Sequence, residues 1–326
     1  MNNEPNYLKY PDIIKEPKNI SLGGENIILY EFNFRSITKL SEFLKSDPPI
    51  NEGFNKRRLS SVINPTKFAG IPYNEAVEKL DNSEDSGYRY YLNINGSIQK
   101  FASPNSTYKT VKTLAGVPDP IAIATNSPYT STTRRKVPQA KKILLHVDVG
   151  ASGETSPDQF LNRAVIVTFL INSLEKLNYD VVVNSFMLGQ YENEVIKATF
   201  NIKESSKLAD YKSLYKTLVG KEFFRRICFR LIEVSDVKKP WQSSYGKPCS
   251  KENCMEIMKI RQNELLFRDP TAMGIKGEDI EDDFENAIRQ LGLERQLNIY
   301  NERKKLRACI EDYKCVEDYK NKTFQK

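Results

Sequence analysis

The chain has a single histidine and a single tryptophan among its 326 residues. A metal site built from several histidines is therefore excluded. Long hydrophobic runs are also missing: the longest, Ala164–Ile171, is far shorter than the roughly 20 apolar residues that cross a bilayer. Residues 1–11 are polar and contain no apolar signal-peptide segment. We therefore expect a cytoplasmic protein without a membrane partner.

Cysteine is scarce, and its count of five is odd. An odd number in a chain without a leader argues against a disulfide framework. The spacing of Cys249 with Cys254, and of Cys309 with Cys315, invites a four-thiolate zinc site. Both spacings are looser than the two to four intervening residues typical of such sites. Buried, unreactive thiols are the alternative that we favour.

Charge is only mildly unbalanced, with a formal net charge of +7. Such an excess permits contact with polyanions but does not reach the concentrated basic face of a dedicated nucleic-acid binder. Two small clusters stand out: Arg57 with Arg58, and Arg134 with Arg135 and Lys136. They are candidate phosphate contacts, with nearby tyrosines able to stack on bases. The alternative for Arg57 and Arg58 is a solvated loop, and Arg134, Arg135 and Lys136 are expected in a flexible lead-in to the core strand.

The strongest structural signal runs from Lys142 to Phe200. Ile143–Val149 is a continuous apolar run typical of a buried strand. Pro157 and Asp158 then open a long helix, because proline is tolerated in the first turn and a carboxylate is favourable there. Asp180–Phe186 predicts a second strand, so the two strands should be parallel and joined by a right-handed crossover.

Three further elements follow the crossover. Glu194–Ile202 predicts a strand antiparallel to its predecessor, Leu208–Val219 a helix, and Ile227–Val234 another buried strand. The order β-α-β-β-α-β, with the third strand reversed, predicts an α/β fold with a three-layer, mostly parallel sheet.

The flanking regions are expected to add helices and one strand. We divide the chain into an N-terminal α+β extension (1–141), an α/β core (142–239) and a helical C-terminal region (240–326). Residues 1–24 are expected to form an extended arm. The expected flanking elements are a strand over Asn26–Phe32 and helices over Ser36–Lys45, Asn74–Leu80, Lys251–Arg268, Gly277–Leu291 and Glu294–Lys314.

The tips of two predicted strands carry acidic residues. Asp148 ends the first core strand, with Ser152 close behind, and Asp236 follows the strand predicted over Ile227–Val234. Ligands of open α/β sheets bind beyond the carboxyl ends of the strands, so both tips are expected at one edge. Oxygen ligands of this kind suit a hard cation such as Mg²⁺. His146 shares a strand face with Asp148, which suggests either an acid–base or metal pair, or a half-buried strand histidine.

The DxGxS motif at Asp148, together with the reversed third strand and the later Ser235-Asp236, resembles the von Willebrand factor A domain. The resemblance covers roughly Lys142–Lys239. It implies a divalent metal held by Asp148, Ser152 and Asp236, whose coordination is completed by a protein partner. Gly150 replaces the first serine of the family motif, so one ligand is lost. No threonine clearly fills the second-loop role, for which Ser205 or Ser206 is the nearest residue.

A second resemblance is wider and less informative. The FxGxPxxEAxxxL segment at Phe68–Leu80, the GVPDP turn at Gly116–Pro120 and the strand-helix-strand block are similar to a family of uncharacterised proteins from phages and their bacterial relatives. The similarity spans about Phe68–Val234. It implies a mobile-element origin and leaves the activity open.

Three functions are compatible with these patterns. The first, which we favour, is a non-catalytic protein-interaction module, with a divalent cation at Asp148, Ser152 and Asp236. The second is a metal-dependent nuclease or phosphohydrolase in which Asp148 and Asp236 hold two metals. The third is a nucleic-acid-binding or virion-associated structural protein, in which case the virion is a second location.

Overall fold

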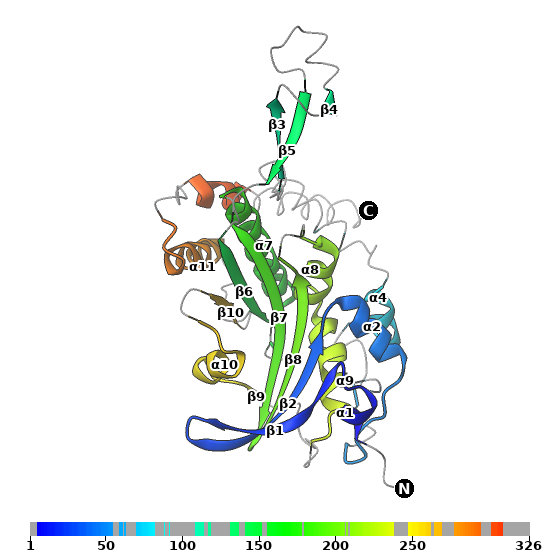
Figure 1. Ribbon diagram of the computed structural model, residues 1–326. Coiled ribbons are helices and arrows are strands. Elements are labelled where there is room, and N and C mark those ends of the chain that lie inside the picture. The colour runs from blue at the N-terminus through cyan, green and yellow to red at the C-terminus, as the bar shows by residue number, and fades with distance from the viewer. Residues whose placement is uncertain are drawn as a thin grey trace, which may run out of the picture.

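The computed structural model describes residues 5–54, 59–60, 62, 70–81, 88, 91, 108–113, 117–118, 131–136, 141–151, 155–177, 179–205, 207, 209–237, 247–261, 264–268, 277–294 and 301–308. These residues form a mixed α/β structure, in which a seven-stranded sheet is covered by helices and a three-stranded sheet stands apart (Figure 1). The order across the large sheet is β1-β2-β8-β7-β6-β10, with β9 paired to β7. Its strands are β1 (Ile14–Leu22), β2 (Glu25–Phe34), β6 (Lys142–Asp148), β7 (Asp180–Tyr191), β8 (Glu194–Lys203), β9 (Lys247–Pro248) and β10 (Leu265–Phe267).

The helices lie on both faces of this sheet. They are α1 (Asn6–Lys9), α2 (Ile37–Lys45), α4 (Tyr73–Lys79), α7 (Pro157–Lys176), α8 (Tyr211–Leu218), the π-helix η2 (Phe223–Cys228), α9 (Phe229–Glu233), α10 (Lys251–Met258) and α11 (Gly277–Gln290). Residues 301–308 are also helical. None of the helices in the described part of the chain is long and apolar enough to span a membrane.

The predicted crossover is confirmed. β6 and β7 pair in parallel from Lys142↔Asp180 to Asp148↔Phe186, with α7 between them. α7 begins after Ser156, which forms a capping box with Gln159. This arrangement satisfies two backbone amides that the helix itself leaves without acceptors. β8 returns antiparallel to β7, so the expected reversal of the third strand is also confirmed.

The N-terminal region builds one edge of the same sheet. β2, predicted over Asn26–Phe32, pairs in parallel with β8, and β1 pairs antiparallel with β2. The segment 1–24, expected to be an extended arm, instead contains the short helix α1 and the edge strand β1. The pairing register of β1 shifts between Lys15 and Lys18, where Pro17 has no N–H to donate. Such irregularities discourage pairing with another chain. One sheet thus joins strands from all three predicted segments.

Most helices pack on one face of the sheet. The core there is a single buried cluster that includes Leu145 and Val147 of β6, Leu170 and Leu174 of α7, and Phe32 of β2. The expected helix at Ser36–Lys45 is α2, and the Ser36 hydroxyl accepts a hydrogen bond from the Lys39 amide at 3.2 Å. That cap is the one expected from the sequence.

The opposite face carries a smaller core beneath α10. Its members come from β1, β2, β7, β8 and α10, and include Leu29, Phe186, Leu188, Cys254 and Ile257. Successive strand residues point to opposite faces. His146 and Asp148 therefore face the side of α10, whereas Leu145 and Val147 face α7.

The strand predicted over Ile227–Val234 is wrong, because this segment is the end of η2 followed by α9. Residues 227–234 are all buried, and a short apolar run in a buried helix cannot be told from a buried strand by periodicity. The helical spacing places Arg230 and Glu233, three residues apart, on one face, where a strand would place them on opposite faces. The neighbour of β6 on the side away from β7 is β10, which also pairs with β6 in parallel.

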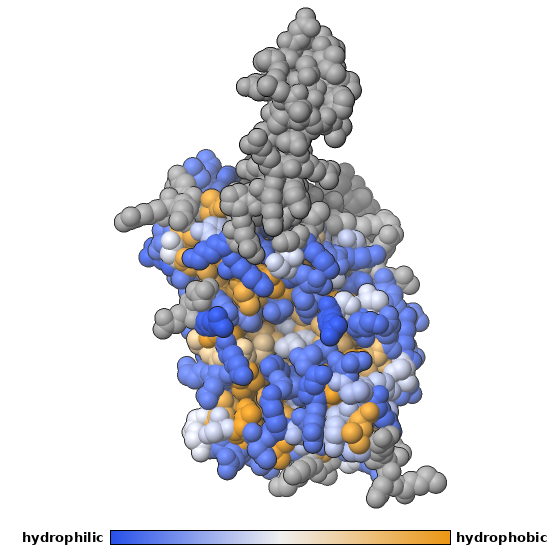
Figure 2. Space-filling view, viewed as in Figure 1, coloured by the Kyte–Doolittle hydropathy of each residue, from blue (hydrophilic) through white to orange (hydrophobic). Residues whose placement is uncertain are grey.

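The helix predicted over Lys251–Arg268 is also wrong in its second half. α10 ends at Met258, and Lys259 adopts a left-handed conformation with φ of 54°. That conformation terminates the helix, and the chain continues to β10 at Leu265. The predicted helix at Gly277–Leu291 is confirmed as α11. Figure 2 shows that the visible face of the main body is largely hydrophilic, with apolar residues in separate small areas.

Candidate functional site

The tip of β6 folds back on itself around Asp148. This residue is buried, with 5% relative exposure. Its Oδ1 accepts a hydrogen bond from the Gly150 amide at 2.8 Å. A Cβ atom at Gly150 would lie 2.9 Å from the same oxygen, which is closer than real Cβ contacts. A side chain at position 150, such as the first serine of the family motif, would therefore require the Asp148 carboxylate to shift. Ser152 lies outside the described residues.

Two cations lie near this carboxylate. Arg163 of α7 is completely buried and donates a hydrogen bond to the backbone oxygen of Asp148. Arg268 directly follows Phe267, which pairs with Val147. The register therefore brings Arg268 next to the strand tip, and its guanidinium donates to the Cys249 oxygen at 2.5 Å. The strand beside β6 thus delivers a positive charge where an acidic residue was expected.

The nearby thiols are neutral. Burial and the negative charge of Asp148 raise the pKa values of Cys249 and Cys254 to about 12. Burial also raises the pKa of Cys228 well above its usual value. Ser250 caps α10, so Cys249 and Cys254 occupy the positions of a hydrophobic staple. Their other predicted zinc partners, Cys309 and Cys315, lie outside the described residues. In the described part of the chain, no three His, Cys, Asp or Glu side chains are grouped as a metal site requires.

Asp236 is hydrogen-bonded to the N-terminal helix α1 and not to the tip of β6. It follows α9 instead of a strand, and its carboxylate accepts hydrogen bonds from the backbone amides of Asn6 at 3.2 Å and Tyr7 at 3.4 Å. The Asn6 side chain in turn donates to the Val234 oxygen at 2.7 Å. The expectation that Asp148 and Asp236 both lie at strand tips on one edge of the sheet is therefore wrong, because the segment before Asp236 is a helix. Asp236 serves as an acceptor at the N-terminus of α1.

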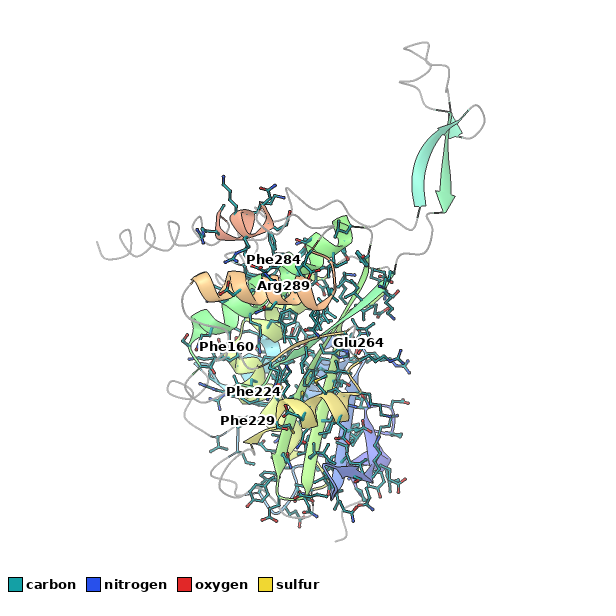
Figure 3. The ribbon with its side chains drawn as sticks, turned by 90° about the vertical axis from the view of Figure 1, so that its left-hand side faces the viewer. Phe160, Phe224, Phe229, Glu264, Phe284 and Arg289 are labelled. Atoms are coloured by element: carbon teal, nitrogen blue, oxygen red, sulfur yellow. The ribbon has the colours of Figure 1, made fainter. Side chains whose placement is uncertain are left out.

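His146 has a partner that the sequence did not suggest. Its Nε2 lies 3.0 Å from Glu264 Oε2, and its Nδ1 has no hydrogen-bond partner. Burial lowers the pKa of His146, and Glu264 partly offsets this shift. Glu264 (labelled in Figure 3) sits just before β10. Sequence analysis missed it because β10 is a strand of only three residues inside a predicted helix.

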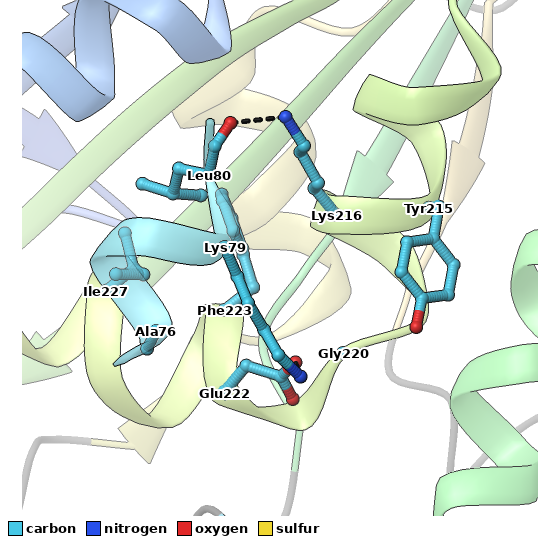
Figure 4. A pocket seen from close by; sticks show the side chains of 9 residues that line it. All are labelled: Ala76, Lys79, Leu80, Tyr215, Lys216, Gly220, Glu222, Phe223 and Ile227. Atoms are coloured by element: carbon cyan, nitrogen blue, oxygen red, sulfur yellow. Dashed lines mark hydrogen bonds and ion pairs between the residues drawn. The ribbon is translucent and has the colours of Figure 1, made fainter. Parts of the chain in front are cut away.

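A small pocket lies between α4, α8 and η2 (Figure 4). Lys216 and Lys79 stand at its rim over an apolar floor. Lys216 donates a hydrogen bond to the Leu80 oxygen at the end of α4, and Lys79 lies 3.6 Å from Glu222. Burial lowers the pKa of Lys216, and neighbouring Lys212 lowers it further. Because both ammonium groups already have protein partners, we assign this pocket a packing role.

The most distinctive surface feature is the basic ribbon, defined here as β3 (Tyr108–Thr113), β4 (Val117–Pro118) and β5 (Ser131–Lys136). Figures 1 and 3 show it projecting away from the main body. β3 and β5 pair antiparallel along their full length, and β4 pairs with the start of β5. The three strands contain five cationic and no acidic residues: Lys109, Lys112, Arg134, Arg135 and Lys136.

Pairing concentrates these cations. Lys109 lies directly opposite Arg135, and Lys136 lies opposite Tyr108. Arg134, Arg135 and Lys136, predicted as nucleic-acid contacts, thus belong to a paired strand and not to a flexible lead-in to β6. The other predicted contacts, Arg57 and Arg58, lie outside the described residues.

Comparison with known proteins identifies a family but no activity. The family described as Domain of unknown function (DUF7192) matches residues 16–295. The chain belongs to the DUF7192 family. No curated protein and no solved structure matches the chain. The match covers both the main body and the basic ribbon, so the two are parts of one DUF7192 domain.

Proposed function

We propose that this DUF7192 protein binds nucleic acid through its basic ribbon, with the α/β body as the scaffold that carries it. The observation that supports the proposal is the pairing of β3 with β5, which gathers five cations and no acidic residue on a projecting element. Like charges directly opposite each other, as at Lys109 and Arg135, destabilise a strand pair. A polyanion relieves that repulsion, and phosphates are the polyanion that Lys and Arg contact in nucleic acids.

A metal at Asp148 is not part of this proposal. Its carboxylate is buried beside neutral thiols, and Asp236 is bonded to α1. The earlier hypotheses of a metal-dependent docking module and of a two-metal nuclease both required these two residues to share one edge of the sheet. A protein partner and a mobile-element origin stay predictions.

We also infer a von Willebrand A-type core, at the level of topology. The order β8-β7-β6-β10, with β8 reversed, supports this inference. β10, and not the segment Ile227–Val234, is the fourth strand of this order. The inference concerns the arrangement of strands and carries no metal with it.

The test is a salt titration of binding, read by fluorescence anisotropy of a labelled DNA duplex. The perturbation is the triple variant R134A/R135A/K136A. Each phosphate contact contributes about 0.9 to the slope of log K against log salt. Loss of three contacts therefore lowers the magnitude of the slope by about 2.7. Between about 50 mM and about 200 mM salt, the affinity of wild type should then fall by about 40-fold more than that of the variant.

A matched control removes three positive charges from the main body. Lys18, Lys39 and Lys207 have exposed side chains in surface ion pairs, and such pairs contribute little to stability. The variant K18A/K39A/K207A has the same net charge as the ribbon variant, and we expect it to bind with the wild-type slope. Wild-type protein that does not bind, or equal slopes for all three proteins, would refute the proposal.

A further inference from the structure

The basic surface continues from the ribbon onto the main body. β5 ends at Lys136 and β6 begins at Lys142, so the intervening chain spans at most about 20 Å. Lys141 and Lys142 are both exposed. Neither forms an ion pair with a described residue. Two further cations therefore stand at the end of the sheet from which the ribbon projects.

The helix at residues 301–308 reaches the same end of the sheet. Glu302 accepts a hydrogen bond at 3.3 Å from Ser173, in the last turn of α7. α7 leads into β7, whose first residue, Asp180, pairs with Lys142. On this helix Arg303 pairs with Asp282 and Glu285, and Lys305 pairs with Glu302. Lys304 is exposed and forms no ion pair with any described side chain.

Among the acidic groups near this end, Glu175 is ion-paired, whereas Asp180 is hydrogen-bonded to a neutral hydroxyl and keeps its negative charge. Asp180 accepts a hydrogen bond from Ser205, and Glu175 lies 2.9 Å from Lys203. The net charge of the described side chains at this end of the sheet is therefore positive. We define the body patch as Lys141, Lys142 and Lys304. Together with the basic ribbon it offers two positive surfaces within reach of a single rod-shaped polyanion.

The shape of the ribbon selects among nucleic acids. Paired strands lie about 4.8 Å apart, so the part of the ribbon that carries Arg134, Arg135 and Lys136, where only β3 and β5 pair, is about 10 Å wide. The major groove of B-form DNA, about 12 Å wide, admits such a ribbon. The major groove of A-form RNA is too narrow. Single-strand binders instead rely on several aromatic side chains that stack on bases, and the three ribbon strands contain one aromatic residue, Tyr108.

We infer that the basic ribbon enters the major groove of double-stranded DNA while the body patch contacts phosphates beside that groove. This inference rests on the proposed function and adds the kind of nucleic acid and the second contact. It predicts that the ribbon decides which duplex is bound, whereas the body patch adds only salt-dependent affinity.

Two measurements test the inference with the full chain. The first compares binding to a DNA duplex, the RNA duplex of the same sequence and one DNA strand. We expect the DNA duplex to bind about tenfold or more tightly than the RNA duplex, because of the groove widths. The second is methylation protection with dimethyl sulfate. Wild-type protein should protect guanine N7, which lies in the major groove, and leave adenine N3 in the minor groove reactive.

Variants separate the two surfaces. For K141A/K142A/K304A, the loss of DNA affinity between about 50 mM and about 200 mM salt should be up to about 40-fold smaller than for wild type. Guanine N7 should stay protected in this variant. The charge-conserving K141R/K142R/K304R should behave as wild type. Binding that is equal or tighter for the RNA duplex or the single strand, or protection at adenine N3 in place of guanine N7, overturns this inference and leaves the proposed function standing. Absence of binding to all three nucleic acids refutes both.

Discussion

Replacing Glu233 with alanine should cost about 3–5 kcal/mol of unfolding free energy, because it removes one partner of a buried charge network. The side chain is fully buried at the end of α9. Its oxygens accept hydrogen bonds from the Ser60 amide at 2.5 Å and the Ser60 hydroxyl at 3.0 Å, and lie 3.7 Å from Arg230. Alanine would leave two buried donors of Ser60 without their acceptor.

Two milder variants calibrate this cost. Ser60→Ala removes one hydrogen bond to a charged group and leaves the backbone amide bonded, so about 1.5–3 kcal/mol is expected. Glu233→Gln keeps an acceptor oxygen but loses the charge opposite Arg230, so its cost should lie between the other two. Arg230 retains Asp47, at 2.8 Å, in every variant. The double variant that combines Ser60→Ala with Glu233→Ala should lose less stability than the sum of the two single losses, because the two residues are in direct contact.

Urea unfolding followed by far-ultraviolet circular dichroism measures these differences as shifts of the midpoint at constant slope. The reasoning fails if Glu233→Ala costs less than about 1 kcal/mol, which is the scale of a surface substitution and not of a buried charge. It also fails if Ser60→Ala and Glu233→Ala are additive, since the pair would then not interact.

Two further predictions concern the side chains once considered for metal binding. Asp236→Ala should destabilise the protein by about 1 kcal/mol, the usual value of a helix cap, and Asp236→Asn should destabilise it by less. Hydrogen exchange at the Asn6 and Tyr7 amides should accelerate in the alanine variant. Unchanged exchange would contradict the capping role. The pKa of His146 is lowered below 6.5 in the folded protein, so folding favours the neutral imidazole. The stability that His146 contributes is fully present above the pKa of the imidazole in the unfolded chain and is lost as the pH falls below that pKa. The stability advantage of wild type over His146→Gln should therefore shrink between about pH 8 and about pH 5. A pH-independent difference between the two would refute this.

The location of β10 explains why the expected strand-tip site did not assemble. Residues 265–267 pair with β6, and a strand this short leaves little periodicity to detect. The longer run at 227–234 carried a much stronger apolar signal but forms a buried helix. Asp236 was consequently assigned to the sheet edge, and Arg268 and Glu264 were overlooked. The site depended on which of two segments packed beside β6, and that choice is made by long-range contacts.

The sequence by itself determined the central crossover, the reversal of β8, the strand end at Asp148, the cap of α2 and the start of α7 at Pro157. These features follow from local patterns, in which apolar period, proline position and capping residues act over a few neighbouring residues. Only the tertiary structure decided that Arg134–Lys136 pair with Tyr108–Lys109 and their neighbours in a projecting ribbon, that Asp236 holds α1, and that Glu264 meets His146. Each of these joins residues more than twenty positions apart, so its geometry depends on how whole elements pack and not on the order of the residues within them.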